Sequence, residues 1–261
     1  MTRVIALANQ KGGVGKTTTA INLGASLAER GQRVLIIDMD PQANATDGLG
    51  LPHDGPLSSY DLVMEDTPLA RVVLSTRYER LSVVPSTPDL AGAEVELTSM
   101  MAREFRLMRA LEGAIDGYDF VLIDCPPSVS LLTVNALTAA NEVIVPVQCE
   151  YLALEGLGQF TKTLDLVRRN LNAGLILRGI VLTMFDRRTG LSHQVAEEVR
   201  KHFPNTFKTI IPRSVRLSEA PSHGKPINDY DPSSPAAEAY RSLAGEVLHA
   251  ANVPTTVEVI P

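Results

Sequence analysis

One stretch near the N-terminus restricts the fold more than any other part of the chain. The apolar run RVIALA at residues 3–8 leads directly into NQKGGVGKTT at residues 9–18, and a helical pattern follows as far as Gly31. A strand, a glycine-rich turn and a helix in succession form the unit that holds phosphate in open α/β sheets. Gly31 suits the end of the helix, because glycine readily adopts the left-handed conformation required there. We therefore expect an α/β protein that binds a phosphorylated ligand.

Further apolar runs predict the other strands of the sheet, at residues 33–38, 81–85, 119–124, 142–147, 177–183 and 207–211. Helical periodicity predicts helices at residues 16–30, about 100–115, 130–140, 153–171, 190–202 and 234–250. Because the strands are almost continuously apolar, helices should cover both faces of the sheet. The predicted fold class is a single-domain, doubly wound, mainly parallel α/β sheet.

Length and composition agree with one domain. The 261 residues, 44% of them hydrophobic, are enough for one large core. We expect one phosphate-binding domain over residues 1–251 and a frayed C-terminal tail over residues 252–261, which has no amphipathic pattern. Residues 41–60 are rich in Gly, Pro, Ser and Asn, which predicts a mobile surface excursion.

Other classes of protein are disfavoured. The apolar runs are too short to cross a bilayer and the N-terminus has no targeting pattern, so a cytoplasmic protein is expected. Two cysteines cannot form a disulfide framework, and neither belongs to a C-x-x-C pair. Cys125 and Cys149 are therefore expected to be buried structural thiols.

The glycine-rich loop offers groups suited to a nucleoside triphosphate. Gly13 and Gly15 let the backbone wrap around phosphate oxygens, Lys16 supplies a positive charge, and the Thr17 hydroxyl suits Mg²⁺. The strict pattern G-x-x-x-x-G-K-[ST] would place a glycine where Gln10 stands.

Two of the predicted strands end in aspartate, at Asp38 and Asp124. Ligands of open parallel sheets bind beyond the carboxyl ends of the strands, so both carboxylates should face the loop. Phosphoryl transfer needs such acids to order the Mg²⁺ shell and to orient the attacking water. The residues alone leave open which acid has which role, or whether both merely cap their strands. Asp40, before Pro41, is either a third acid of the site or a turn-starting residue.

Positive charge gathers in residues 187–225, which hold eight Lys or Arg and three acidic residues. This segment carries +5 and the whole chain −6, so the rest carries −11. Such asymmetry permits an anionic partner on one side of an acidic body. Aromatic interleaving and a recognition helix are missing, so any DNA binding should be independent of base sequence.

The segment KGGVGKTT at residues 11–18 resembles the deviant Walker A loop, K-G-G-x-G-K-[ST]-T, at every position. In that family the extra lysine, here Lys11, reaches the nucleotide of a partner subunit, so the resemblance implies a homodimer with ATP between the subunits. It assigns ATP binding to the whole loop: Lys11, Gly12, Gly13, Val14, Gly15, Lys16, Thr17 and Thr18.

Two acidic segments resemble the family's switches. DMDPQAN at residues 38–44 is similar to switch I, and DCPPS at residues 124–128 is similar to Walker B and switch II. The resemblance implies that Thr17, Asp38 and Asp124 serve Mg²⁺. It also implies that Asp40 orients the hydrolytic water and that Asp40, Lys11 and Lys16 are the catalytic residues.

TMFDRRTG at residues 183–190 and the stretch at residues 210–232 closely resemble ParA/Soj-type partition ATPases. The resemblance covers about residues 3–250 and implies non-specific double-stranded DNA binding by Arg188 and Arg216. Arg187, Lys201 and Lys208 are possible helpers, and Pro212 and Arg213 match the loop that packs on adenine. The implied protein is a nucleoid-associated DNA segregation ATPase, released from DNA when a ParB-type centromere-binding protein stimulates hydrolysis.

Four alternatives use the same scaffold. One is a positioning ATPase for another cargo. A MinD-type membrane-associated regulator would need a C-terminal amphipathic helix, which HAANVPTTVEVIP does not predict, so no membrane partner is expected. A tyrosine kinase or cluster-loading ATPase would need a C-terminal tyrosine cluster or a C-x-x-C pair. A sequence-specific autorepressor would need an N-terminal DNA-binding domain, and here the loop begins by residue 11.

Overall fold

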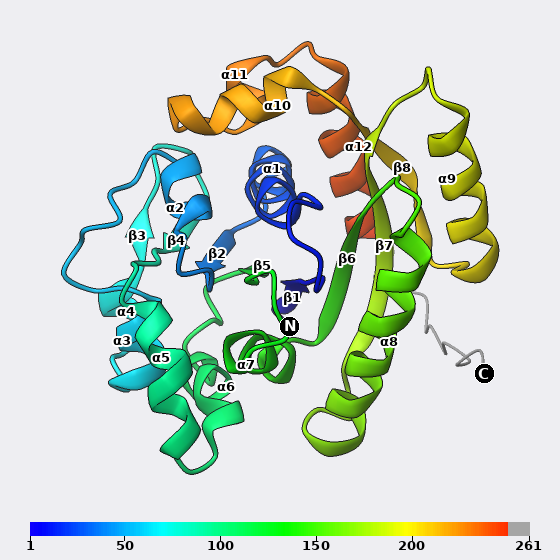
Figure 1. Cartoon of the computed structure of the whole chain (residues 1–261). Helices are drawn as coiled ribbons and strands as arrows, with labels where there is room; N and C mark the ends of the chain where they lie inside the picture. Colours follow the sequence, from blue (N-terminus) through cyan, green and yellow to red (C-terminus); the bar gives the residue numbers. More distant parts are fainter. Residues whose placement is uncertain (250–261) are drawn as a thin grey trace.

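An eight-stranded sheet forms the centre of the computed structural model, which describes residues 1–249 (Figure 1). The strand order is β3-β4-β2-β5-β1-β6-β7-β8, and every neighbouring pair is parallel except β3 with β4. The predicted doubly wound, mainly parallel α/β fold is confirmed. The strands are β1 (Arg3–Leu7), β2 (Val34–Asp38), β3 (Leu74–Ser75), β4 (Leu81–Val84), β5 (Phe120–Asp124), β6 (Glu142–Gln148), β7 (Ile176–Phe185) and β8 (Thr206–Pro212).

Helices cover both faces of the sheet, because its central strands are buried along almost their whole length. On one face α1 (Lys16–Glu29) and α12 (Pro235–His249) share a hydrophobic core with the sheet. On the other, α7 (Leu131–Ala139), α8 (Ala153–Asn170) and α9 (Gly190–His202) pack into a second core. Figure 1 shows α1 and α12 on one side of the strands and α7 on the opposite side.

These five helices and all strands except β3 coincide with predicted segments, with ends that differ by up to two residues. Helix α1 ends as the sequence indicates, because Gly31 has a φ of +83° and its N–H bonds the carbonyl of Ala28. Cys125 and Cys149 are buried free thiols, as expected.

The single helix predicted at about 100–115 is wrong. The chain forms α5 (Leu90–Glu96), the 3₁₀ turns η1 (Leu97–Ser99) and η2 (Arg103–Phe105), and a short α6 (Arg106–Leu111). Ala102 has a φ of +51°, which no α-helix accommodates. The buried Arg106 side chain donates to the carbonyls of Val63 and Met64, so tertiary contacts override the local helical pattern.

The surface excursion predicted at residues 41–60 is also wrong over much of its length. It contains α2 (Asn44–Gly48), in which Ala45 and Thr46 are completely buried. At its end α3 (Ser59–Met64) begins with a capping box between Ser58 and Asp61. Residues 52–56 do lie at the surface. The Gly, Pro, Ser and Asn residues do form turns here, but α2 has only five residues, too few to show a helical period of apolar residues.

Several short elements were not predicted at all: α4 (Leu69–Val72), α10 (Val215–Glu219), the 3₁₀ turn η3 (Ala220–His223), α11 (Ile227–Tyr230) and β3. The predicted frayed tail at residues 252–261 lies outside the described residues. Among residues 1–249, no helix is long and apolar enough to span a bilayer.

Candidate active site and nucleic-acid interface

The carboxyl ends of β2, β5 and β1 bring the predicted site together. Asp38 and Asp124 are direct register partners in β2 and β5, and Asp124 is also opposite Leu7 at the end of β1. The glycine-rich loop leaves β1 at this point, so both aspartates lie at the edge of the sheet where the loop begins. In Figure 1 this loop lies near the centre of the view.

The loop has the conformation that its glycines predict. Gly13 and Gly15 have φ values of +72° and +89°, which residues with a Cβ rarely adopt. Gly15 is also the N-cap of α1, where no side chain caps the helix and no acid occupies the first turn. The first N–H groups of α1 and its dipole therefore favour an anion, as a phosphate site requires.

Two residues distant in the sequence, Pro146 and Thr183, hold the loop in place. The Asn9 side chain donates to the carbonyl of Pro146 at 2.7 Å and accepts from the N–H of Lys11 at 3.0 Å. At the end of β7, the Thr183 hydroxyl donates to the carbonyl of Val14 at 2.8 Å. These contacts preorganise the loop on β6 and β7.

Lys16 is buried within this edge, with 6% of its surface exposed. Its ammonium donates to the carbonyl of Lys11 at 3.2 Å, inside the curve of the loop. Burial lowers the pKa of Lys16, and the nearby Asp124 opposes this shift by favouring the charged form. The cation is therefore directed at the space between the loop and the aspartates.

Asp124 is completely buried, and neither carboxylate oxygen has a hydrogen-bond partner of normal geometry within residues 1–249. Burial raises the pKa of Asp124, the neighbouring Asp38 raises it further, and the Thr17 hydroxyl and Lys16 lower it. Buried carboxylate oxygens without donors are rare in folded proteins. A hydrated Mg²⁺ would supply both a positive charge and donor water molecules, so this residue set fits that ion.

Asp38 is equally buried, and both of its carboxylate oxygens accept hydrogen bonds. Its Oδ2 accepts from both the N–H and the hydroxyl of Thr46, and its Oδ1 accepts from the N–H of Asp40. Burial raises the pKa of Asp38, whereas the Thr46 hydroxyl lowers it. Asp38 thus neighbours Asp124 in the sheet and bonds to the backbone of Asp40.

Asp40 lies at the mouth of the site and is 7% exposed. Its Oδ1 accepts from the N–H of Gln42 at 3.0 Å, in the turn that a residue before Pro41 was expected to start. Within residues 1–249 no protein group donates a hydrogen bond to its Oδ2, which can accept from water. This geometry allows both interpretations of Asp40, as a turn former and as a water-orienting acid.

Lys11 lies on the outer side of the loop, where its ammonium pairs with Glu150 at 3.1 Å. Both side chains are about half exposed. Tyr151 and Leu152, which follow Glu150 directly, are 83% and 54% exposed. An exposed cation and an exposed apolar pair therefore flank the phosphate loop.

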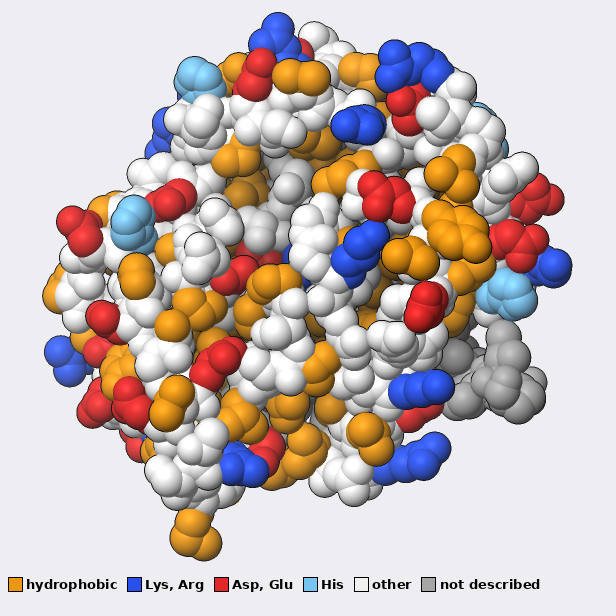
Figure 2. All heavy atoms as spheres, in the orientation of Figure 1, with side chains coloured by type: hydrophobic (Ala, Val, Ile, Leu, Met, Phe, Trp, Pro, Cys, Tyr) orange, Lys and Arg blue, Asp and Glu red, His pale blue; other side chains and the backbone are white. Residues whose placement is uncertain are grey.

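The basic segment forms a surface beside this site. Arg187, Arg188 and Arg213 lie on the loops after β7 and β8, which are joined by a hydrogen bond from the N–H of Arg213 to the carbonyl of Phe185. Figure 2 shows Lys and Arg side chains along the upper rim of this face, near α10 and the loop before α9. We call the exposed residues Arg187, Arg188, Arg213 and Arg216 the basic rim.

Two members of the basic rim are paired within the chain. Arg188 makes a bidentate ion pair with Asp186 and lowers the pKa of that carboxyl. Arg216 pairs with Glu219 at 2.9 Å and lies over the ring of Tyr230. Arg187 and Arg213 have no ion-pair partner in the described part of the chain. Exposed pairs of this kind are weak, so a phosphate group can compete for these arginines.

Pro212 and Arg213 lie on the same edge of the sheet as the phosphate loop. Pro212 ends β8 and is the register partner of Phe185, two residues beyond the Thr183 that holds the loop. Both residues therefore lie at the carboxyl ends of the strands, where the phosphate loop also lies.

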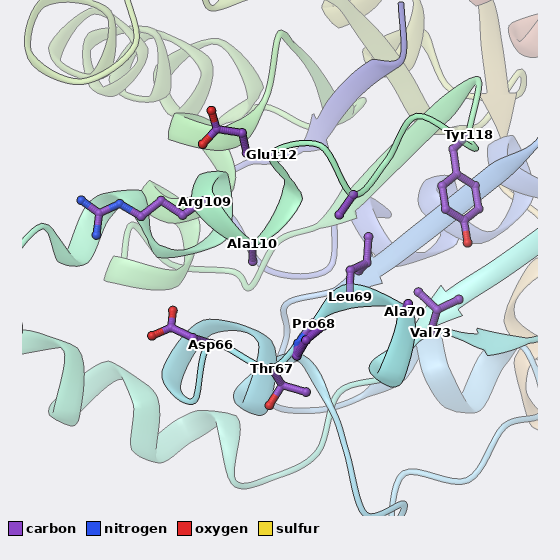
Figure 3. Close-up of a pocket in the computed structure, with 11 residues that line it drawn as sticks. Asp66, Thr67, Pro68, Leu69, Ala70, Val73, Arg109, Ala110, Glu112 and Tyr118 are labelled. Carbon is purple, nitrogen blue, oxygen red and sulfur yellow. The ribbon is translucent and has the colours of Figure 1, made fainter.

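A pocket of about 610 Å³, separate from the phosphate loop, lies between the segment after α3 and the end of α6. In Figure 3 its lining comes from residues 66–70 and Val73 on one side and from Arg109, Ala110 and Glu112 on the other. Tyr118, which also lines it, lies just before β5 begins. The pocket is therefore toward the amino ends of the strands, away from the phosphate loop.

Sequence reasoning missed four residues that shape the site: Asn9, Thr46, Glu150 and Thr183. None belongs to the loop pattern. Each makes its contact with a residue at least eight positions away in the sequence. The position of Thr183 at the end of a predicted strand was the one signal available for it.

The fold and the loop together define a P-loop nucleoside triphosphatase of the deviant Walker A type. The family model described as an AAA domain matches residues 2–177. The sporulation initiation inhibitor protein Soj of Bacillus subtilis is 56% identical over 249 residues, covering 95% of this chain and 98% of that protein. The chromosome partitioning protein ParA of Myxococcus xanthus is 54% identical over 248 residues, covering 94% and 88%.

A solved structure extends the likeness to three dimensions. Cobyrinic acid a,c-diamide synthase from Mycobacterium smegmatis with bound ADP and magnesium is 38% identical and has a TM-score of 0.83, covering 99% of this chain and 100% of that one. The two relatives named above share considerably more of the sequence. This chain therefore belongs to the ParA/Soj family of chromosome-partitioning ATPases.

Proposed function

We propose that this protein segregates DNA by a cycle in which ATP binding forms a DNA-binding homodimer and ATP hydrolysis releases it. The observation that carries the proposal is the convergence of an anion-binding helix terminus, the buried Lys16 and three aspartates at one edge of the sheet. The exposed arginines of the basic rim beside this edge support the proposal that phosphate backbones bind next to the nucleotide site.

Residues 11–18 hold the phosphates of ATP through the N–H groups of the loop and of α1, and Lys16 provides the central charge. Pro212 and Arg213 contact the adenine. Lys11 exchanges its pair with Glu150 for the nucleotide of the partner subunit, and that exposed pair costs at most about 1 kcal/mol to break. The exposed Tyr151 and Leu152 beside it are available to the second subunit.

When bound with ATP, Mg²⁺ would supply positive charge to the phosphates during transfer. Thr17 supplies a hydroxyl ligand, Asp124 accepts from the water molecules of the ion, and Asp38 supports that shell. Asp40, at the mouth of the site, orients the attacking water for in-line displacement. ADP and phosphate are the products, and loss of the bridging nucleotide favours the monomer.

Arg188 and Arg216, with Arg187, Lys201 and Lys208 as helpers, contact the phosphate backbone of double-stranded DNA without reading its bases. The dimer therefore associates with the nucleoid in the cytoplasm, and a ParB-type centromere-binding protein stimulates hydrolysis and release. The cargo is a chromosome or plasmid origin. The high identity to chromosome-partitioning proteins favours DNA over another large cargo and over the membrane of a MinD-type regulator.

The test measures binding of the purified protein to unrelated DNA duplexes across a salt series with no nucleotide, ADP, or a slowly hydrolysed ATP analogue. We expect binding only with the analogue, equal for all sequences and steeply weaker at higher salt. The same series is measured for Arg216→Ala, which removes a proposed DNA contact. Arg33→Ala is its matched control, because Arg33 is also exposed and ion-paired but precedes β2 at the opposite edge of the sheet.

DNA binding that requires no ATP analogue would contradict the proposed switch, and binding to one sequence alone would contradict the backbone contact. If no nucleotide state binds DNA and an organic acid stimulates hydrolysis instead, a synthase of the kind found in Mycobacterium smegmatis becomes the better interpretation.

A further inference from the structure

We infer that Thr46 is a positioning residue that sets the orientation of the Asp38 carboxylate for the nucleotide site. Thr46 lies on α2, completely buried, and both of its polar donors point to one atom, Oδ2 of Asp38. The inference rests on the proposed role of Asp38 in supporting the magnesium shell, and it adds a residue outside the loop and both switch segments.

The direction of each hydrogen bond follows from the groups involved. The N–H of Ser86 can only donate, so the Thr46 hydroxyl oxygen is the acceptor of that bond, at 3.0 Å. The single hydroxyl hydrogen is then free to donate to Asp38 Oδ2 at 2.7 Å, and the N–H of Thr46 adds a bond of 2.9 Å. A hydrogen bond to a carboxylate is about twice as strong as one between neutral groups.

These bonds hold one side of the carboxylate and leave the other side available. Oδ1 accepts only the 3.2 Å bond from the N–H of Asp40. Asp38 therefore presents Oδ1 toward Asp40 of switch I. Without the Thr46 hydroxyl, one backbone donor remains on Oδ2, and the carboxylate gains rotational freedom.

Thr46 is itself held by a rigid frame. Ser86 follows β4, whose Val84 is the register partner of Ile37 in β2, one residue before Asp38. On the other side, α2 packs closely on α1, since a Cβ at Gly48 would approach the side chain of Ile21 to 2.5 Å. Thr46 thus links the Asp38 carboxylate to the end of β4 and, through α2, to α1. Such a link suits a residue that positions the carboxylate.

The experiment compares Thr46→Val, which keeps the shape and removes the hydroxyl, with Thr46→Ser, which keeps the hydroxyl. Thr2→Val is the matched control: the Thr2 hydroxyl also makes two hydrogen bonds, to the carbonyls of Ile115 and Tyr118, at the amino end of the sheet. Each protein is titrated with Mg²⁺ at a fixed concentration of a fluorescent, slowly hydrolysed ATP analogue, and its steady-state hydrolysis of ATP is measured.

For Thr46→Val we expect about tenfold more Mg²⁺ at half-maximal analogue binding and about a tenfold lower kcat, as for loss of one charged hydrogen bond. Affinity for ADP in EDTA should change less than twofold. Thr46→Ser should stay within about threefold of the parent, and Thr2→Val should lose thermal stability without any change in Mg²⁺ dependence. If Thr46→Val does not fold, Thr46→Ala removes the same hydroxyl without placing a methyl group beside the carboxylate.

A Thr46→Val or Thr46→Ala protein with the Mg²⁺ dependence and kcat of the parent would overturn the inference. So would equal losses in Thr46→Val and Thr46→Ser, which would show that packing at residue 46 matters and that its hydroxyl has no special role. Failure of the parent protein itself to bind the analogue with Mg²⁺ would instead overturn the proposed function, so the two failures are distinguishable.

Discussion

The edge of the sheet that carries the phosphate loop, Lys16, Asp38 and Asp124, here called the phosphate edge, differs from the basic rim in how its charges are surrounded. At the phosphate edge, Lys16, Asp38 and Asp124 are at most 6% exposed. The loop carbonyl of Lys11 accepts from Lys16, and Thr46 of α2 donates to Asp38. On the basic rim, the side chains of Arg188 and Arg216 are 86% and 58% exposed, and their closest partners are two and three residues away in the sequence.

The difference shows what each region can recognise. Buried charges interact strongly and cannot be left unpaired, so the phosphate edge accepts one ligand in one geometry. Exposed charges are screened by salt and their side chains remain adaptable, so the basic rim suits a repeating phosphate backbone of any sequence. Substitutions should therefore have large, specific effects at the edge and small, similar effects on the rim.

The largest effect is expected for Lys16→Ala. Loss of the buried cation removes the charge that faces the phosphates, and it leaves the aspartates uncompensated, so ATP affinity should fall about 100-fold or more. Calorimetric titration with ATP and Mg²⁺ measures this. Lys162→Ala, on the exposed side of α8, is the control and should bind normally. Near-parental affinity in Lys16→Ala would remove the contrast between the two regions.

The next largest effect is expected for Asp40→Ala, and it should be confined to chemistry. Loss of the group that orients the attacking water should slow hydrolysis about 100-fold while ATP still binds, so the protein should remain on DNA. Phosphate release and DNA dissociation are measured together. Asp47→Ala, seven residues further along and exposed in its pair with His53, should behave like the parent. Unimpaired hydrolysis in Asp40→Ala would leave its carboxylate with only the turn-forming role.

On the basic rim, Arg216→Ala should weaken analogue-dependent DNA binding by only about fivefold, as expected for one exposed charge contact. The loss should be the same for unrelated duplexes, and the slope of log K against log salt should fall by about one. Fluorescence anisotropy across a salt series measures both, while ATP hydrolysis without DNA should be unchanged. A loss limited to one duplex would show that the rim reads bases.

The smallest effect is expected for Asp186→Asn, and its sign is opposite. The substitution frees Arg188 from its bidentate partner and removes one negative charge from the rim, so DNA affinity should rise about twofold at low salt. The same anisotropy series with Arg188→Ala gives the reference. If neither variant changes DNA affinity, Arg188 lies outside the interface and the rim is smaller than proposed.

The sequence predicted the phosphate edge better than its surroundings, and the reasons are local. The loop glycines that adopt positive φ lie within one short stretch of sequence. Asp38 and Asp124 each directly end an apolar run, so these features can be recognised from consecutive residues. Residues 41–60 and about 100–115 were predicted wrongly because buried contacts decided them: Thr46 binds Asp38, and Arg106 binds carbonyls of α3. The roles of individual site residues remain predictions.

By itself, the sequence determined that a parallel α/β sheet would carry a phosphate loop with two aspartates at the same edge, because each of these features is written in consecutive residues. Only the tertiary structure decided that Thr46 and Ser86 would hold Asp38, that Thr183 would hold the loop, and that Lys11 would pair with Glu150. Those contacts join segments that the order of the strands brings together, and no local pattern of apolar and polar residues specifies that order.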